Sequence, residues 1–297
     1  MHPAPRDGET WRFLVTNYIP RRLATRFIGW FSRIESRRLT RLAIAVWRLF
    51  VDELDLSEAK KREGEFTSLR DCFIRELRPG ARPLEGGAET LVSPCDAVVG
   101  AHGELAGREL LQIKGSPYAL EDLVPDARLV RHFENGRFVT LRLRSTMYHR
   151  FHAPVDCHVD AVTYVSGDTF NVDPPTLRRI PGLFTRNERA LIPLTVNGAL
   201  EILLVPVAAI LVASLRLHCL PEALNVNWRG PNRLACDAAY ARGDEMGWFE
   251  HGSTIVMLTT RNYDFATGIR AGEEIRMGRS LMQRAARTTA DPAAAAA

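Results

Sequence analysis

Hydrophobic and polar positions follow a helical rhythm in the first part of the chain. Between Thr10 and Leu54, aromatic and aliphatic residues alternate with arginines, and Pro20 and the polar stretch 32–36 divide them. Apolar residues at this spacing form one face of a helix. The pattern predicts two or three short amphipathic helices, apolar on one face and rich in Arg on the other.

The rhythm changes farther along. Leu69, Phe73 and Leu77 predict one more helix, with Thr67 or Ser68 as its cap and Pro79-Gly80 as its end. From Leu91 onward, short β-forming runs are separated by Gly, Pro, Asn and Asp clusters, which is typical of a β-rich domain. The predicted strands are 97–101, 138–143, 159–165, 190–194, 200–215 and 254–260. The fold class predicted is therefore α+β, with a mainly β, sandwich-like domain behind amphipathic N-terminal helices. The tail 291–297 has the composition of a disordered segment.

The charge distribution indicates a function for the predicted helices. The net charge is +4, but residues 1–50 alone hold ten Arg against three acidic residues. Arginines beside bulky apolar residues on amphipathic helices are typical of helices that lie in a membrane interface, and each basic residue near an anionic surface contributes roughly 1 kcal/mol. The alternative is that these helices pack on the main domain or on a second subunit. A nucleic-acid partner is not predicted, because no reader motif accompanies the arginines.

The compartment follows from what the chain lacks. The longest apolar run, 202–215, is too short to span a bilayer and contains Pro206, so no transmembrane helix is predicted. The five cysteines are widely spaced without a C-x-x-C pair, which favours a reducing compartment over a disulfide framework or a zinc knuckle. No secretion signal is recognised. Together with the basic helices, this predicts a peripheral protein on the cytoplasmic side of the cell membrane.

Three clusters carry candidate chemistry. His149 and His152 lie three residues apart after a predicted strand and are candidates for acid–base work; the alternatives are structural histidines or a metal site, although no metal-binding frame surrounds them. Asp96 follows a Ser-Pro-Cys turn and by itself is typical of a cap or turn residue. Ser253 follows Gly252 directly before the apolar run 254–260. Asp96, His152 and Ser253 together give the residue types of a nucleophile with its base and orienting acid. The G-x-S-x-G frame of α/β-type serine hydrolases is absent.

Six motifs in order resemble one family, the pyruvoyl-dependent, membrane-associated phosphatidylserine decarboxylases of prokaryotic type. The resemblance runs from about Phe66 to Met282. The motifs are 73–83, Ser93-Pro94-Cys95-Asp96, Ile113-Lys114-Gly115, Tyr148-His149-Arg150-Phe151-His152, 184–189, and 243–249 leading to Gly252-Ser253-Thr254.

This resemblance implies a proenzyme (zymogen) that cuts itself. His152, held by Asp96, would take the proton of Ser253, whose oxygen attacks the carbonyl of Gly252; elimination and loss of ammonia would leave a pyruvoyl group at position 253. The products would be a beta chain, 1–252, and an alpha chain, 253–297, that stay together as a heterodimer, with higher oligomers open. The pyruvoyl group would convert phosphatidylserine to phosphatidylethanolamine and CO2 through a Schiff base, a step of phospholipid biosynthesis in which His149 would act. Residues 1–65 would form the membrane-association segment and 66–290 the catalytic domain.

Neither a metal nor pyridoxal phosphate is expected as cofactor. Outside the Lys60-Lys61 pair, the chain contains only Lys114 as a candidate for the aldimine that pyridoxal phosphate requires, and no pyridoxal motif surrounds it. Three positions depart from the family pattern: Cys95 and Ala97 flank Asp96 where Ala and Gly are usual, and His251 precedes Gly252 where an aliphatic residue is usual. Two other functions stay open, a serine hydrolase that uses Asp96, His152 and Ser253 without chain cleavage, and a membrane-surface scaffold in which Gly252-Ser253 is a turn.

Overall fold

The computed structural model describes residues 27–51, 54–111, 117–209, 214–225, 228–250 and 254–285. Several predictions from the sequence fall outside these ranges. They concern the helix predicted before residue 27, the Lys114 motif, His251, Gly252, Ser253 and the tail 291–297.

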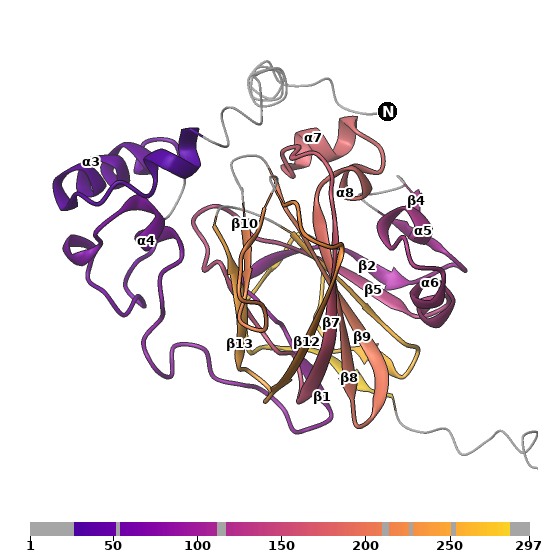
Figure 1. The fold of residues 1–297 in the computed structure, drawn as a ribbon. Coiled ribbons are helices and arrows are strands. Elements are labelled where there is room, and N and C mark those ends of the chain that lie inside the picture. The colour runs from indigo at the N-terminus through magenta and orange to yellow at the C-terminus, as the bar shows by residue number, and fades with distance from the viewer. Residues whose placement is uncertain are drawn as a thin grey trace, which may run out of the picture.

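Antiparallel sheets form the main body of the described chain (Figure 1). The large sheet has the order β12-β7-β8-β9-β14-β5-β2-β16, and a four-stranded sheet has the order β11-β10-β13-β6. A third sheet has the order β1-β17-β15, and β3 pairs with β4. The large sheet comprises β2 (Ala97–Glu104), β5 (Arg137–Arg142), β7 (Cys157–Val165), β8 (Arg189–Val196), β9 (Ala199–Val207), β12 (Arg233–Tyr240), β14 (Thr254–Thr259) and β16 (Glu274–Ile275). The smaller sheets comprise β1 (Thr90–Val92), β3 (Glu109–Leu111), β4 (Pro117–Ala119), β6 (Arg150–His152), β10 (Ser214–Leu217), β11 (Leu224–Asn225), β13 (Glu245–Phe249), β15 (Tyr263–Phe265) and β17 (Ser280–Arg284).

The large and four-stranded sheets share one hydrophobic core, which confirms the α+β, mainly β class. Ile255 of β14 and Leu204 of β9 belong to the same buried cluster as Phe249 of β13 and Phe151 of β6. All six residues of β14 are buried, because the strand lies between β9 and β5. A strand with neighbours on both sides and cover on both faces reads as a continuous apolar run, which is why the sequence identified it well.

One predicted strand is wrong. The run 200–215 is not a single strand, because β9 ends at Val207 in the large sheet and the chain re-enters a different sheet as β10. Apolar residues continue through this crossing because both sheets face the same core. The other five predicted strands are confirmed within a few residues.

Short helices cover the sheets and form the N-terminal part. Near the sheets lie α5 (Leu120–Leu123), α6 (Ala127–Phe133), α7 (Pro174–Arg179) and α8 (Leu183–Arg186). Residues 27–31 are also helical, followed by α3 (Arg37–Arg48), the 3-10 turn η1 (Glu63–Glu65) and α4 (Leu69–Phe73). Ser36 caps α3 by accepting a hydrogen bond from the Leu39 amide, and Ser68 caps α4. The helix predicted through Leu77 is too long: α4 ends at Phe73, and Leu77 instead forms a β-bridge with Ala59.

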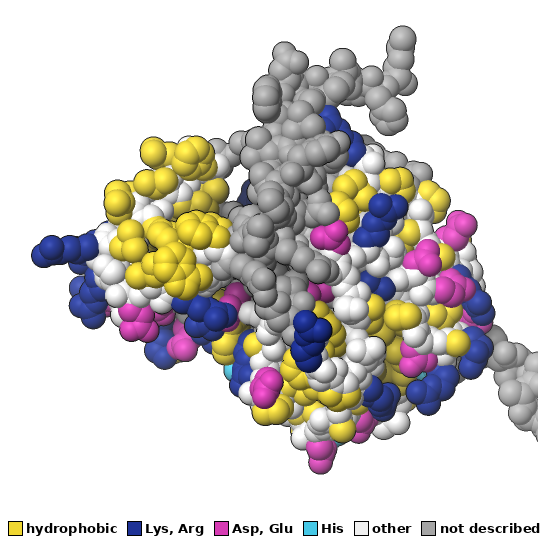
Figure 2. Space-filling model, turned by 45° about the horizontal axis from the view of Figure 1, so that its top comes forward, with side chains coloured by type: hydrophobic (Ala, Val, Ile, Leu, Met, Phe, Trp, Pro, Cys, Tyr) yellow, Lys and Arg dark blue, Asp and Glu magenta, His cyan; other side chains and the backbone are white. Residues whose placement is uncertain are grey.

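We call residues 27–51 and 54–78 the helical segment. It lies at one side of the sheets and has a small core of its own, made of Ile44, Leu54, Leu56, Ala59, Phe66 and Cys72. Helix α3 turns Thr40 and Ile44 inward. Its opposite face exposes Leu42 and Val46. Leu49 and Phe50, directly after the helix, are exposed as well, as are Phe27 and Trp30 of the preceding turn. Figure 2 shows these apolar side chains gathered on the helical segment. Within the described residues, no helix is both long and apolar enough to cross a membrane.

Candidate active site

In sequence, the predicted cleavage site falls between β13 of the four-stranded sheet and β14 of the large sheet. β13 ends at Phe249 and β14 begins at Thr254, directly after Ser253. Thr254 pairs with Arg142 of β5, and Arg142 pairs with Val98 of β2, two residues after Asp96. Since adjacent strands lie about 4.8 Å apart, the register brings the start of β14 and the start of β2 to the same end of the large sheet. Asp96 is therefore near the start of β14 although more than 150 residues separate them in sequence.

His152 is held in one defined protonation form. Its Nδ1 lies 2.8 Å from the carbonyl oxygen of Gly243, and its Nε2 lies 3.0 Å from the hydroxyl of Tyr148. A carbonyl oxygen only accepts, so Nδ1 donates, and Nε2 accepts from Tyr148. Burial lowers the pKa of His152 below its ordinary value of 6.5, so the ring is neutral at pH 7. A neutral imidazole with its lone pair on Nε2 is the form that a general base requires.

Asp96 is anchored by a neighbouring arginine. Its carboxylate accepts two hydrogen bonds from Arg82, at 2.9 and 2.6 Å, and a third from the Met277 amide at 2.8 Å. Arg82 is itself shared with Glu58, at 2.7 Å. Both side chains of the Arg82–Asp96 pair are largely buried, so the pair is only weakly screened by solvent.

His149 occupies a different environment from His152. It is fully buried, and its Nδ1 lies 2.8 Å from the carbonyl oxygen of Met147, to which it donates. The ring of Phe73, from α4, packs against the imidazole with centroids 3.9 Å apart. The His149 carbonyl accepts from the Phe249 amide at 3.0 Å, which ties the backbone of His149 to the end of β13.

The structure thus brings some of the predicted site residues together and leaves others unplaced. Within the described part of the chain, no hydrogen bond joins Asp96 to His152; only the charge of Asp96 acts on the imidazole, as a lesser influence on its pKa. The two residues are linked instead through backbone, since the His152 amide donates to the Pro94 carbonyl at 2.8 Å. Gly252 and Ser253 lie outside the described residues.

Two side chains that sequence reasoning did not single out touch the predicted ones. Tyr148 contacts His152, and Arg82 contacts Asp96. Both lie inside the motifs that carry the family resemblance, but their roles depend on contacts across the fold: Arg82 precedes Asp96 by 14 residues and reaches it only after the loop 79–90 has closed.

The motif 184–189 of the resemblance has a structural role. Arg189, at the start of β8, donates to the carbonyl oxygens of Asp122, Leu123, Thr185 and Asn187. The Asn187 side chain donates to the carbonyls of Phe170 and Ala208 at 2.9 and 2.8 Å. These contacts fix α5, α8 and the loop after β7 to one another and satisfy backbone acceptors that loops leave open.

Two other kinds of chemistry were candidates, a cysteine nucleophile and a metal site. Cys95, one of the departures from the family pattern, is fully buried, and burial raises the pKa of its thiol, which makes it a poor nucleophile. Among the described residues, no group of three or more His, Cys, Asp or Glu side chains is arranged to hold a metal ion.

Known proteins resemble the chain over most of its length. The family model described as phosphatidylserine decarboxylase matches residues 69–283. A "Phosphatidylserine decarboxylase proenzyme" of Shewanella sp. (strain W3-18-1) is 36% identical over 278 residues, covering 89% of this chain and 94% of the relative. Proteins of the same name from Shewanella putrefaciens and from Shewanella sp. (strain MR-4) are 36% and 35% identical, the latter over 92% of this chain and 96% of its own. These matches show that the protein is a decarboxylase. The chain belongs to the phosphatidylserine decarboxylase family.

Proposed function

We propose that the chain is a self-cleaving proenzyme that becomes a decarboxylase of phosphatidylserine. The observation that carries this proposal is the family match over residues 69–283, which includes every predicted site residue. The relatives' name, a proenzyme, supports maturation by chain cleavage. The serine hydrolase is less well supported, because Ser253 directly precedes β14 and the strand–turn–helix arrangement of a hydrolase nucleophile is missing there.

Self-cleavage would use the neutral imidazole of His152. Its Nε2 takes the proton of the Ser253 hydroxyl, and the Ser253 oxygen attacks the Gly252 carbonyl carbon. The Gly252–Ser253 amide bond breaks as the Ser253 nitrogen gains a proton, which leaves an ester. Loss of the Ser253 α-proton then expels the Gly252 carboxylate. Water adds at the carbon of residue 253 that carries the nitrogen, and the nitrogen leaves as ammonia. Tyr148 holds the Nε2 lone pair in the described structure, so its hydroxyl must give way to Ser253 or pass the proton along.

The product at position 253 would be a pyruvoyl group. The surroundings fit such a group: the chain enters the buried strand β14 at Thr254, which is fully buried, and the neutral His152 and the buried His149 lie on the segment paired with β13. When formed, the group supplies an electron-accepting carbonyl of the kind that decarboxylation of an amino acid head group needs. His149 would bind the substrate carboxylate or hold a proton for the product carbon.

The sheets explain how two chains would remain one protein. After cleavage, the small chain 253–297 would contribute β14, β15, β16 and β17. β14 pairs with β5 and β9 of the large chain along its full length, and β17 pairs with β1. These ladders bury their backbone hydrogen bonds, so separating the chains requires unfolding of the large sheet.

Peripheral attachment to the cytoplasmic side of the membrane would use the helical segment. Its exposed face combines large apolar side chains with the exposed arginines Arg37, Arg38 and Arg41. This combination is typical of helices that bury one face at the boundary of an anionic bilayer.

Intact mass spectrometry of the denatured protein tests the cleavage. We expect two fragments that meet between Gly252 and Ser253, the smaller one lighter by one ammonia than a peptide that begins with Ser. Ser253→Ala should give a single full-length, inactive chain. If active wild-type protein instead keeps one full-length mass and reacts at Ser253 with a fluorophosphonate, the hydrolase replaces the decarboxylase.

A further inference from the structure

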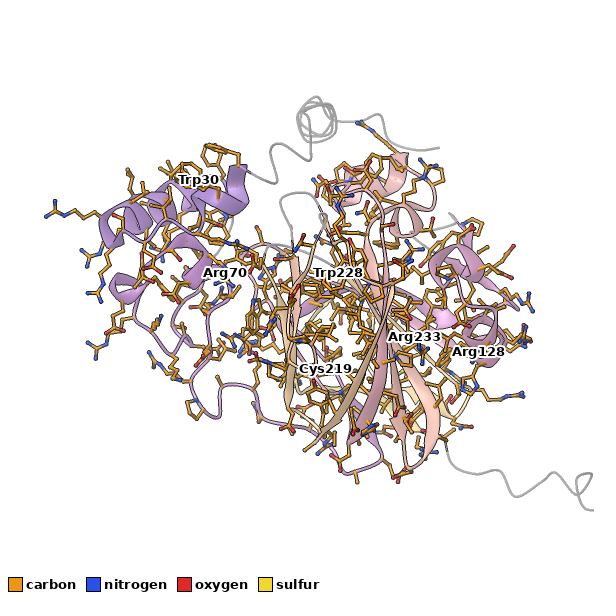
Figure 3. All side chains as sticks on the ribbon, in the orientation of Figure 1. Trp30, Arg70, Arg128, Cys219, Trp228 and Arg233 are labelled. Carbon is orange, nitrogen blue, oxygen red and sulfur yellow. The ribbon has the colours of Figure 1, made fainter. Side chains whose placement is uncertain are left out.

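An ion cluster around the buried carboxylate of Glu250 joins the helical segment to the end of β13. The Glu250 carboxylate accepts a hydrogen bond from Arg33 at 2.7 Å and two from Arg70, at 2.9 and 2.7 Å. Arg33 follows the first helical turn of the segment, and Arg70 lies in α4. Figure 3 shows Arg70 between the helical segment and the sheets, whereas Trp30 lies on the segment's upper side, away from them. The cluster therefore connects parts of the chain that are 180 residues or more apart.

The burial of Glu250 distinguishes this cluster from surface ion pairs. The Glu250 side chain is 8% exposed, while Arg70 is 30% exposed and Arg33 is 59% exposed. Burial alone would raise the pKa of Glu250, but the hydrogen bonds from Arg70 and Arg33 outweigh it and hold the pKa below its ordinary value. A buried carboxylate needs both guanidinium groups, since an unpaired charge in this environment is costly.

Glu250 connects this cluster to the predicted cleavage site. Glu250 is the last described residue before the cleavage site and precedes Gly252 by two positions. Its amide donates to the Ser214 carbonyl at 3.1 Å, so its backbone continues the pairing of β13 with β10. Past the site, Thr254 is fixed by β5 and β9. The chain is thus anchored on both sides of the site, by the sheet after it and by the Glu250 carboxylate before it.

Helix α4 touches the site a second time. Phe73, three residues after Arg70, packs on His149, and Trp47 of α3 packs on Phe73 with ring centroids 6.1 Å apart. The helical segment thereby contacts both Glu250 and His149, whose backbones are tied together by the hydrogen bond from the Phe249 amide to the His149 carbonyl. The segment therefore contacts two residues near the predicted cleavage site and also carries the exposed apolar face.

We propose that Glu250 is a positioning residue for self-cleavage. Clamped by Arg70 and Arg33, it fixes the end of β13, two residues before the Gly252 carbonyl that the Ser253 oxygen attacks. A displacement of about 1 Å between reacting atoms can cost 10²-fold in rate, so a carboxylate two residues away has leverage on this step. The inference rests on the proposed self-cleavage and adds to it a requirement for the helical segment.

The test measures the cleavage rate of newly synthesised chains by mass spectrometry over time. We expect Glu250→Gln to slow cleavage by about tenfold or more, because the amide cannot pair with both guanidinium groups. Arg70→Gln should slow it less, and Arg33→Gln least, in the order of their hydrogen bonds and burial. Glu250→Asp should recover most of the rate. The matched control is Glu63→Gln, which removes an exposed pair with Arg48 in the same segment and should leave the rate unchanged.

Four outcomes overturn the proposal; the first also contradicts the proposed function, and the other three contradict only the role of Glu250. Wild-type chains that never cleave contradict self-cleavage itself. Wild-type chains that cleave, beside folded Glu250→Gln chains that cleave equally fast, contradict the role of Glu250. If Glu250→Gln does not fold, an unchanged rate in folded Arg70→Gln contradicts it instead. Hydroxylamine, which cuts an oxygen ester, should release no more fragments from Glu250→Gln than form without it; rapid release would place the defect after the attack on Gly252 and overturn the positioning role.

Discussion

The domain formed by the sheets, here called the sheet domain, buries its large apolar side chains, whereas the helical segment exposes several of its own. In the sheets, every residue of β14 is buried, and its neighbours β5 and β9 are buried along most of their length. In the helical segment, Ile44 of α3 is buried, but Leu49 and Phe50, directly after α3, are exposed to 80% and 75%. Both regions are rich in apolar residues, so composition does not separate them. The difference shows that the exposed residues of the segment contribute little to folding and are available to another surface.

The two regions meet at the histidines of the site. Phe73 of the helical segment covers His149, whereas Tyr148 and the Gly243 carbonyl, both of the sheet domain, hold His152. One region therefore supports the residue predicted to act on substrate, and the other supports the residue predicted to act in cleavage. The predictions below test this division, beginning with the largest expected effect.

The largest effect is expected at His152. His152→Ala should slow chain cleavage by about 10²-fold or more, because a general base contributes about 10²–10⁴-fold. His149→Ala should still be cleaved but should lose decarboxylase activity. In wild-type chains the cleavage rate should fall as the pH drops below 6.5, the ordinary pKa of His, with its midpoint at lower pH, because burial lowers the pKa of His152 and protonation removes the base. Mass spectrometry at several pH values measures the cleavage. Cleavage of His152→Ala at the wild-type rate would contradict the division.

A matched pair of truncations compares the stability of the two regions. Leu258→Ala removes a fully buried side chain of β14 and should lower the free energy of unfolding by about 2–5 kcal/mol. Leu42→Ala removes a side chain that is 62% exposed and should change it by less than about 0.5 kcal/mol. Urea denaturation in the Ser253→Ala background measures both, because the chain then stays whole. Equal losses would mean that the apolar face of α3 is buried in the folded protein.

Binding to vesicles should depend on the exposed face of the helical segment and not on the buried side chains of the sheets. Replacing Trp30 and Phe50 by Ala should weaken binding to anionic phospholipid vesicles by about tenfold or more, since burying one large apolar side chain contributes about 1.5–3 kcal/mol. Leu84→Ala, at an exposed apolar residue outside the helical segment, is the control and should bind as wild type. Raising the salt concentration should weaken binding further through the arginines. Co-sedimentation measures all three, and undiminished binding of the double variant would remove the membrane role of this face.

Local patterns were enough to identify most elements. The apolar run of β14, the Ser36 division before α3 and the strands at 138–143 and 159–165 follow from periodicity and turn chemistry, which act over a few residues. The merged strand at 200–215 and the overlong helix through Leu77 were wrong for one reason: whether an apolar residue continues an element or leaves it depends on which sheet or bridge it joins. Element ends are set by tertiary partners, and one sequence does not contain them.

The sequence by itself determined the family, the α+β class and the residue types that can carry the chemistry, because ordered motifs and periodicity are written along the chain. Tertiary structure decided which of those residues meet. It assigned Arg82 to Asp96, Tyr148 and the Gly243 carbonyl to His152, and Arg33 and Arg70 to Glu250. These contacts join positions up to 217 residues apart; burial keeps His152 neutral, and the hydrogen bonds from Arg70 and Arg33 keep the buried Glu250 charged. Both depend on packing in three dimensions, which residue order alone does not specify.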